Sequence, residues 1–226
     1  MHRTTRAFML VIALTLGHLA VGDTAQAQGD RTYQVKITNL TQAQSFTPIL
    51  LAAHSPDVRM FFAGTAASPE LQALAETGNT APLAAVLAGL AGVSDMTTSA
   101  GLLSRGVTVA LMITAGASAT RLSLAAMLIP TNDAFVGLNT ELPHDFATKE
   151  VYANVYDAGS EWNDELCASI PGPAYSECGG PGGGATIGSG EGAITIHRGI
   201  QGVGDFDASI RDWRNPGARV RIRRID

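Results

Sequence analysis

The sequence predicts a mainly β protein, an antiparallel β-sandwich with one short helical insertion. Seven or eight segments have strand length and either alternate apolar with polar residues or are apolar throughout. Turn-forming residues separate most of them, and helix signals are confined to residues 68–90. Many short strands with a single helical interruption are typical of two antiparallel layers around one core.

The chain begins with the features of a secretory signal peptide, residues 1–27. Arg3 and Arg6 precede an apolar run, and an Ala-x-Ala site at 25–27 predicts cleavage before Gln28. The run is shorter than the roughly 20 apolar residues of a membrane-spanning helix. We therefore expect an exported protein, periplasmic or secreted, that is not an integral membrane protein and consists of one domain, residues 28–226.

The first strands follow directly. Residues 33–37 alternate apolar and polar side chains, as a half-buried strand does. Residues 46–53 form a second expected strand, in which Pro48 suits a strand start or an edge position. Ser68 before Pro-Glu-Leu has the order of a helix N-cap, and that helix should stop at Gly78. A second short helix is expected from Thr80 to residue 87 or 90.

Two continuous apolar runs, residues 107–114 and 122–129, predict central strands buried on both faces. Further strands are expected at residues 135–138, 151–156, 193–200 and 219–225. In the last one, Val220 and Ile222 should face inward while three arginines, Arg219, Arg221 and Arg223, face outward. Such a stripe is either a solvated strand face or a surface for phosphate or another acidic ligand.

The charge and the cysteine content narrow the range of possible partners and sites. Without residues 1–27, the 15 basic and 20 acidic residues fall to 13 and 19, a net charge of −6. An acidic balance argues against nucleic acid as a partner. The two cysteines, Cys167 and Cys178, fit neither a C-x-x-C motif nor a four-ligand zinc pattern. After export we expect them to form one disulfide.

Three acidic side chains lie beside turn-forming residues at strand ends: Asp133, Asp157 and Glu161. Asp157 and Glu161 are four apart across Ala-Gly-Ser, a segment too turn-like for a helix, so a tight loop could direct both to one point. Calcium takes several oxygen ligands and tolerates carboxylates from loops at irregular spacing. Magnesium has the same ligand type, and the residues alone also allow three solvated loop acids without a metal.

Several strings in the chain resemble one known family. Similarity to the spondin domain is found in the strings ITNLT, SLAAMLIPTNDAFVGLN and YDAGSEWNDE, and in the closing HRGI and DWRNPGARVRI. This is the amino-terminal module of F-spondin and mindin-type matrix proteins, and it also occurs alone in bacterial secreted proteins. The resemblance extends over residues 33–225. It is carried mainly by Asp-x-Phe-Val-Gly followed by Tyr-Asp-Ala-Gly.

The resemblance implies both a site and a function. The family's first two metal-binding aspartates map onto Asp133 and Asp157, and the third, usually Asp, maps onto Glu161. It implies a β-sandwich akin to calcium-dependent phospholipid-binding domains, with calcium at one end, and adhesion or ligand binding instead of catalysis. The partner expected is an extracellular or cell-surface protein or glycan, and Trp162 beside the ligands is a candidate contact residue.

A second hypothesis is a metal-dependent hydrolase that acts on an extracellular glycan or ester through the same acidic cluster. The sequence offers this reading little support. His54, His144 and His197 are spread along the chain without an H-E-x-x-H helix, and Ser189 lacks the glycine two residues earlier that a nucleophile elbow needs. A non-catalytic, calcium-binding module is the first hypothesis.

Overall fold

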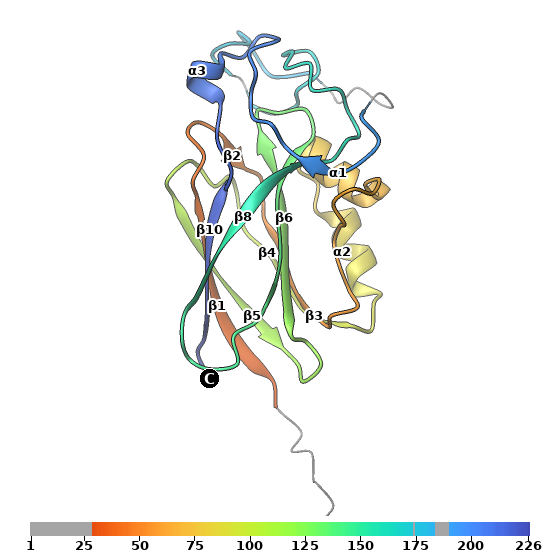
Figure 1. The fold of residues 1–226 in the computed structure, drawn as a ribbon, viewed down its shortest axis with the longest axis vertical. Coiled ribbons are helices and arrows are strands. Elements are labelled where there is room, and N and C mark those ends of the chain that lie inside the picture. Colours follow the sequence, from red (N-terminus) through yellow and green to blue (C-terminus); the bar gives the residue numbers. More distant parts are fainter. Residues whose placement is uncertain (1–28, 174, 184–189) are drawn as a thin grey trace, which may run out of the picture.

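The computed structural model describes residues 29–173, 175–183 and 190–226; the predicted signal peptide, residues 1–27, lies outside them. In this part of the chain, ten strands form one antiparallel sheet that curves round upon itself (Figure 1). The mainly β fold with sandwich-like packing is thus confirmed. The strands are β1 (Arg31–Asn39), β2 (Ser45–Phe46), β3 (Leu50–His54), β4 (Val93–Thr98), β5 (Thr108–Ala115), β6 (Arg121–Ile129), β7 (Ala134–Glu141), β8 (Lys149–Asp157), β9 (Thr195–Ile196) and β10 (Ala218–Arg224).

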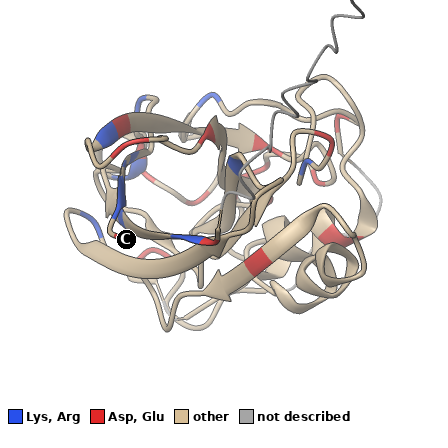
Figure 2. Ribbon diagram, turned by 90° about the horizontal axis from the view of Figure 1, so that it is seen from below, with Lys and Arg blue, Asp and Glu red and all other residues tan. Residues whose placement is uncertain are grey.

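The two edge strands of the sheet, β4 and β5, lie next to each other. Neighbours run β4-β3-β6-β7-β8-β10-β1-β5, with β2 beside β6 and β9 beside β8. The edge strands β4 and β5 are joined by side chains: Asp95 Oδ2 accepts from the Thr114 amide at 2.7 Å, and Ser94 Oγ donates to the Thr114 carbonyl at 3.1 Å. We call these contacts the clasp. Seen from below, the strands form a nearly closed ring (Figure 2).

Apolar side chains at every second position of the strands fill the interior of this ring. Val35 and Ile37 of β1 and Val220 and Ile222 of β10 are fully buried, while the residues between them face outward. The register places Val35 opposite Ile222 and Ile37 opposite Val220. Burying one such aliphatic side chain stabilises the fold by roughly 1.5–3 kcal/mol. The predicted inward and outward faces of the last strand are therefore correct.

Two helices cover the outer face of one part of the sheet, as Figure 1 shows. They are α1 (Pro69–Thr77) and α2 (Ala81–Ala88), which confirms the predicted insertion. Ser68 Oγ accepts from the Leu71 amide at 3.2 Å, and Gly78 ends α1 at a φ of 70°. Buried leucines of both helices pack on Leu50, Ala125 and Phe135, so β6 is buried on both faces.

Three strand predictions need correction. Residues 46–53 are two strands, because the chain bulges around Pro48. Phe46 pairs with Leu128 and Leu50 pairs with Ala125, so four residue steps on this segment match three on β6. Residues 107–114 give the edge strand β5, whose burial alternates, instead of a strand buried on both faces. Of residues 193–200 only Thr195 and Ile196 form a strand.

The predicted disulfide is present. Cys167 and Cys178 are bonded, with their Cα atoms 5.5 Å apart. They close a loop that lies, with a third short helix α3 (Ala208–Arg211), at the end of the ring opposite the C terminus (Figure 1). Of the glycine-rich run 179–192, residues 184–189 lie outside the described part. The same end of the ring carries the acidic residues singled out from the sequence.

Candidate metal and ligand-binding site

Strand pairing places Asp133 and Asp157 beside each other. Asp133 immediately precedes β7 and Asp157 ends β8, and these strands pair with Ala134 opposite Asp157. The Ala158 amide donates to the Asp133 carbonyl at 3.2 Å, which continues the pairing by one residue. Two carboxylates far apart in sequence therefore meet at one end of the sheet.

A tight turn then folds the next residues over Asp133. Gly159 has a φ of 68°, and a Cβ there would lie 2.4 Å from the Ala193 carbonyl oxygen, so only glycine fits. Its amide donates to Asp157 Oδ1 at 2.7 Å. The amides of Ser160 and Glu161 donate to Asp133 Oδ2 at 2.8 and 3.1 Å. Asp133 and Asp157 thus lie side by side, and Glu161 contacts Asp133 through its backbone amide.

Burial distinguishes these acids from solvated loop residues. Asp133 and Glu161 are fully buried, and Asp157 is 7% exposed. Asp133 Oδ1 is buried and receives no hydrogen bond from an amide or hydroxyl within the described part of the chain, and the Asp133 and Asp157 carboxyls are close enough to share a proton. Burial, and next the negative charge of Asp157, raise the pKa of Asp133, and burial likewise raises the pKa of Asp157. An anionic pair held this way is destabilised unless a proton or a cation compensates it.

The residues fit a hard cation in donor chemistry. Asp133 Oδ1 is a buried oxygen without a donor, and carboxylate oxygens are the ligands that calcium and magnesium prefer. Across residues 29–173, 175–183 and 190–226, no group of three or more His, Cys, Asp or Glu side chains is gathered in a way that could hold a metal ion. The metal role of Asp133, Asp157 and Glu161 therefore stays a prediction.

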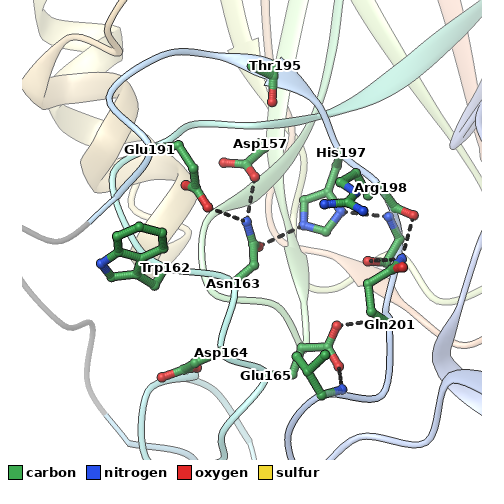
Figure 3. A pocket seen from close by; sticks show the side chains of 12 residues that line it. Asp157, Trp162, Asn163, Asp164, Glu165, Glu191, Thr195, His197, Arg198 and Gln201 are labelled. Carbon is green, nitrogen blue, oxygen red and sulfur yellow. Dashed lines mark hydrogen bonds between the residues drawn. The ribbon is translucent and has the colours of Figure 1, made fainter.

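A pocket of about 490 Å³ opens next to Asp157 (Figure 3). Its wall includes a chain of polar contacts that the sequence did not reveal. Asn163 Nδ2 donates to Asp157 Oδ2 at 2.5 Å and to Glu191 Oε1 at 3.4 Å. His197 Nε2 lies 3.1 Å from Asn163 Oδ1, and Figure 3 draws these contacts as one line from Asp157 to His197.

The tautomer of His197 follows from its second contact. The Gly199 amide donates to Nδ1 at 3.0 Å, so Nδ1 is the unprotonated nitrogen and Nε2 carries the proton that it donates to Asn163. Burial lowers the pKa of His197 to about 4, and its ring packs 5.0 Å from that of Trp213. Both ring nitrogens are in use.

Two further acids beside the pocket, Glu165 and Asp164, have hydrogen-bond partners of their own. The Glu165 carboxylate accepts from the amides of Gln201, Gly202 and Val203 at 2.5, 2.7 and 3.0 Å. Asp164 accepts from Asn132 Nδ2 at 2.9 Å and from Ser169 Oγ at 2.7 Å. These contacts fix the loops around the pocket.

The rim of the pocket carries exposed apolar side chains. Trp162 is 59% exposed and Val203 is 69% exposed, and both line the pocket. In Figure 3 the indole of Trp162 lies beside Asn163 and Glu191. A large aromatic ring that stays in solvent beside polar groups is a feature of recognition surfaces. Trp162 therefore has the exposure that a contact residue requires.

A pocket and buried acids thus lie together at the loop end of a nearly closed antiparallel ring. The family model Spondin_N matches residues 31–162, more than half of the chain, which includes Asp133, Asp157 and Glu161. The chain belongs to the Spondin_N family. A comparison with curated proteins gave no match.

Family membership supports an extracellular ligand-binding or adhesion-type module, and the family is not known for enzymes. The disulfide fits an oxidising compartment. Among the described helices, none has both the length and the apolar character needed to cross a lipid bilayer.

Proposed function

We propose that the chain is exported, binds one calcium ion through Asp133, Asp157 and Glu161, and presents the adjoining pocket to an extracellular ligand without catalysing a reaction. One observation carries the metal part: Asp133 Oδ1 is buried beside the Asp157 carboxyl and has no amide or hydroxyl donor in the described residues. A cation would supply the missing partner and offset the repulsion between Asp133 and Asp157.

The metal's role in this proposal is electrostatic and structural. Calcium neutralises clustered carboxylates when it is bound. Asp157 belongs both to the acidic pair and, through Asn163, to the pocket wall. Order at the metal site is thereby transmitted to the loop that carries Trp162. The proposed consequence is a firmer pocket, which reduces the entropy lost when a ligand binds.

The hydrolase hypothesis has less support. A general acid or base must come within hydrogen-bond reach of the substrate. Asp133 is fully buried and does not line the pocket, and both nitrogens of His197 are engaged. Asp157 does line the pocket, but its two oxygens accept from Gly159 and Asn163. These engagements favour binding over turnover.

Thermal unfolding of the purified protein tests the proposal, with calcium, with magnesium and with a chelator. We expect a rise in the unfolding midpoint that is specific to calcium and absent from an Asp133→Asn, Asp157→Asn double variant. The matched control is Asp57→Asn, which removes an exposed carboxylate elsewhere and should keep the response. The same midpoint in all three solutions would remove the metal from this account.

A further inference from the structure

The outer face of the β1/β10 strand pair carries a cluster of positive charge that the calcium site does not use. We call the cluster formed by Lys36, Arg219, Arg221 and Arg223 the basic face. The register places Lys36 directly opposite Arg221. Arg219, Arg221 and Arg223 alternate with buried residues of β10, so all three leave the same side of the sheet. In Figure 2 the blue segments of β10 approach the marked C terminus.

The charges of the basic face are poorly compensated. Arg221 Nε lies 3.4 Å from Glu150 Oε2, in a pair whose side chains are 51% and 40% exposed. Within the described part of the chain, the side chains of Lys36, Arg219 and Arg223 have no hydrogen-bond or ion-pair partner. Four cations with one nearby anion stand out on a chain whose net charge is −5.

Like charges placed directly across a strand pair destabilise a sheet. Lys36 and Arg221 hold such positions at the centre of the basic face, and no acidic residue separates them in the register. A bound anion between the two side chains would turn this repulsion into attraction. The sequence thus retains an arrangement that is unfavourable in the free protein and favourable in a complex with an anion.

The surface is also hollowed at this point. A depression of about 150 Å³ is lined by Gln34, Lys36, Thr148, Arg221 and Arg223. Its lining combines ammonium, guanidinium, amide and hydroxyl groups, all of which can donate hydrogen bonds to oxygen. Guanidinium groups match the geometry of tetrahedral oxyanions by paired N–H donors. Sulfate or phosphate monoester groups have the chemistry that this depression would recognise.

The layout favours a chain-like ligand over a single small anion. Alternate residues of one strand are spaced by roughly 6.5–7 Å, so the three arginines of β10 form a row about 13 Å long. Tyr152 lies opposite Arg219 and is 54% exposed, so its ring is available to pack on a sugar. We propose that the basic face binds a sulfated or phosphorylated polysaccharide that lies along β10, independently of the calcium site.

Binding of dextran sulfate to the purified protein tests this proposal in the presence of chelator, with unmodified dextran as the uncharged control. The test variant is Arg221→Gln with Arg223→Gln. The matched control variant is Arg59→Gln with Arg105→Gln, which removes the same charge from exposed positions outside the basic face. Lys36→Gln is a third variant, and all variants are first checked for an unchanged unfolding midpoint.

We expect the Arg221/Arg223 variant to bind dextran sulfate about tenfold more weakly than the unchanged protein, and the control variant to match the unchanged protein. Lys36→Gln should weaken binding as well. Raising the salt from about 50 to about 300 mM should weaken it further because exposed charges are then screened.

Equal affinity of the test and control variants would overturn the proposal, as would equal binding of dextran and dextran sulfate. Vesicles that contain an anionic phospholipid provide the remaining arm. Binding to these vesicles without binding to dextran sulfate would assign the basic face to a membrane and would also overturn it. Because chelator is present throughout, a failure of the calcium proposal leaves this result unaffected.

Discussion

The ion pair between Glu177 and Arg211 should be a strong single contributor to stability at the loop end of the ring. Arg211 Nε and Nη2 donate to the two carboxylate oxygens of Glu177 at 2.7 and 2.8 Å. The guanidinium also lies 5.7 Å from the ring centre of Tyr175 and 5.8 Å from that of Phe206. The pair joins the disulfide loop to α3. We predict that Glu177→Gln loosens this junction.

The size of the effect follows from the pKa of Glu177. Its hydrogen bonds to Arg211 lower the pKa from 4.5 to about 2. This change corresponds to roughly 3 kcal/mol of the free energy of unfolding. Each of the two side chains is 14% exposed, so solvent screens part of the interaction. We therefore expect Glu177→Gln to lower the free energy of unfolding by about 2 kcal/mol.

The depressed pKa fixes the pH dependence. The stabilisation is fully present above the unfolded-state value of about 4.5 and is lost as the pH falls toward 2. Urea unfolding of the protein and of Glu177→Gln should therefore differ by a constant amount between about pH 5 and 7. The difference should shrink below pH 4.5 and vanish near pH 2, where Glu177 becomes protonated.

Glu141→Gln is the matched control. Glu141 pairs with Arg121 at 4.0 Å, but its side chain is 71% exposed, so the change should cost less than about 0.5 kcal/mol. The reasoning fails if the two substitutions have equal effects. It also fails if the difference between the protein and Glu177→Gln does not depend on pH below 4.5.

Three further predictions concern other regions. With a dissociation constant of about 0.1 mM, about 1 mM calcium should add about 1.4 kcal/mol to the free energy of unfolding, a gain that Asp133→Asn should lose in a denaturant titration. Gly159→Ala should lower the unfolding midpoint clearly, because the new methyl group meets the Ala193 carbonyl and the φ of 68° is strained; an unchanged midpoint would contradict this. Asp95→Ala removes the acceptor for the Thr114 amide, which hydrogen exchange should then find exchanging faster while amides of β6 stay protected.

The sequence predicted those elements whose signals are local. Ser68 and Gly78 mark the ends of α1, and the alternation in β1 and β10 reports one buried face. β4 was not foreseen, because four of the six residues in its sequence VSDMTT are polar and most of the six are of intermediate exposure. It becomes a strand through pairing with β3 and the clasp to β5, which are long-range contacts.

The site divides in the same way. Asp133, Asp157 and Glu161 were identifiable as candidates because each lies at a strand end or in a turn. The structure places Asp133 beside Asp157 and links Glu161 to Asp133 through its backbone amide. The contact between Asn163 and His197 could not be predicted, because it depends on β9 pairing with the end of β8. A strand of two residues leaves no periodic pattern to detect.

The clasp has a consequence for how copies of this chain behave at high concentration. An exposed strand edge is a template on which another chain can add a strand, and this is a common beginning of fibril growth and of strand exchange between copies. Here the outermost strands, β4 and β5, face each other, and Asp95 and Ser94 occupy main-chain groups of β5 that a foreign strand would need. The two polar side chains thus close one position, Thr114, at which a foreign strand would otherwise pair.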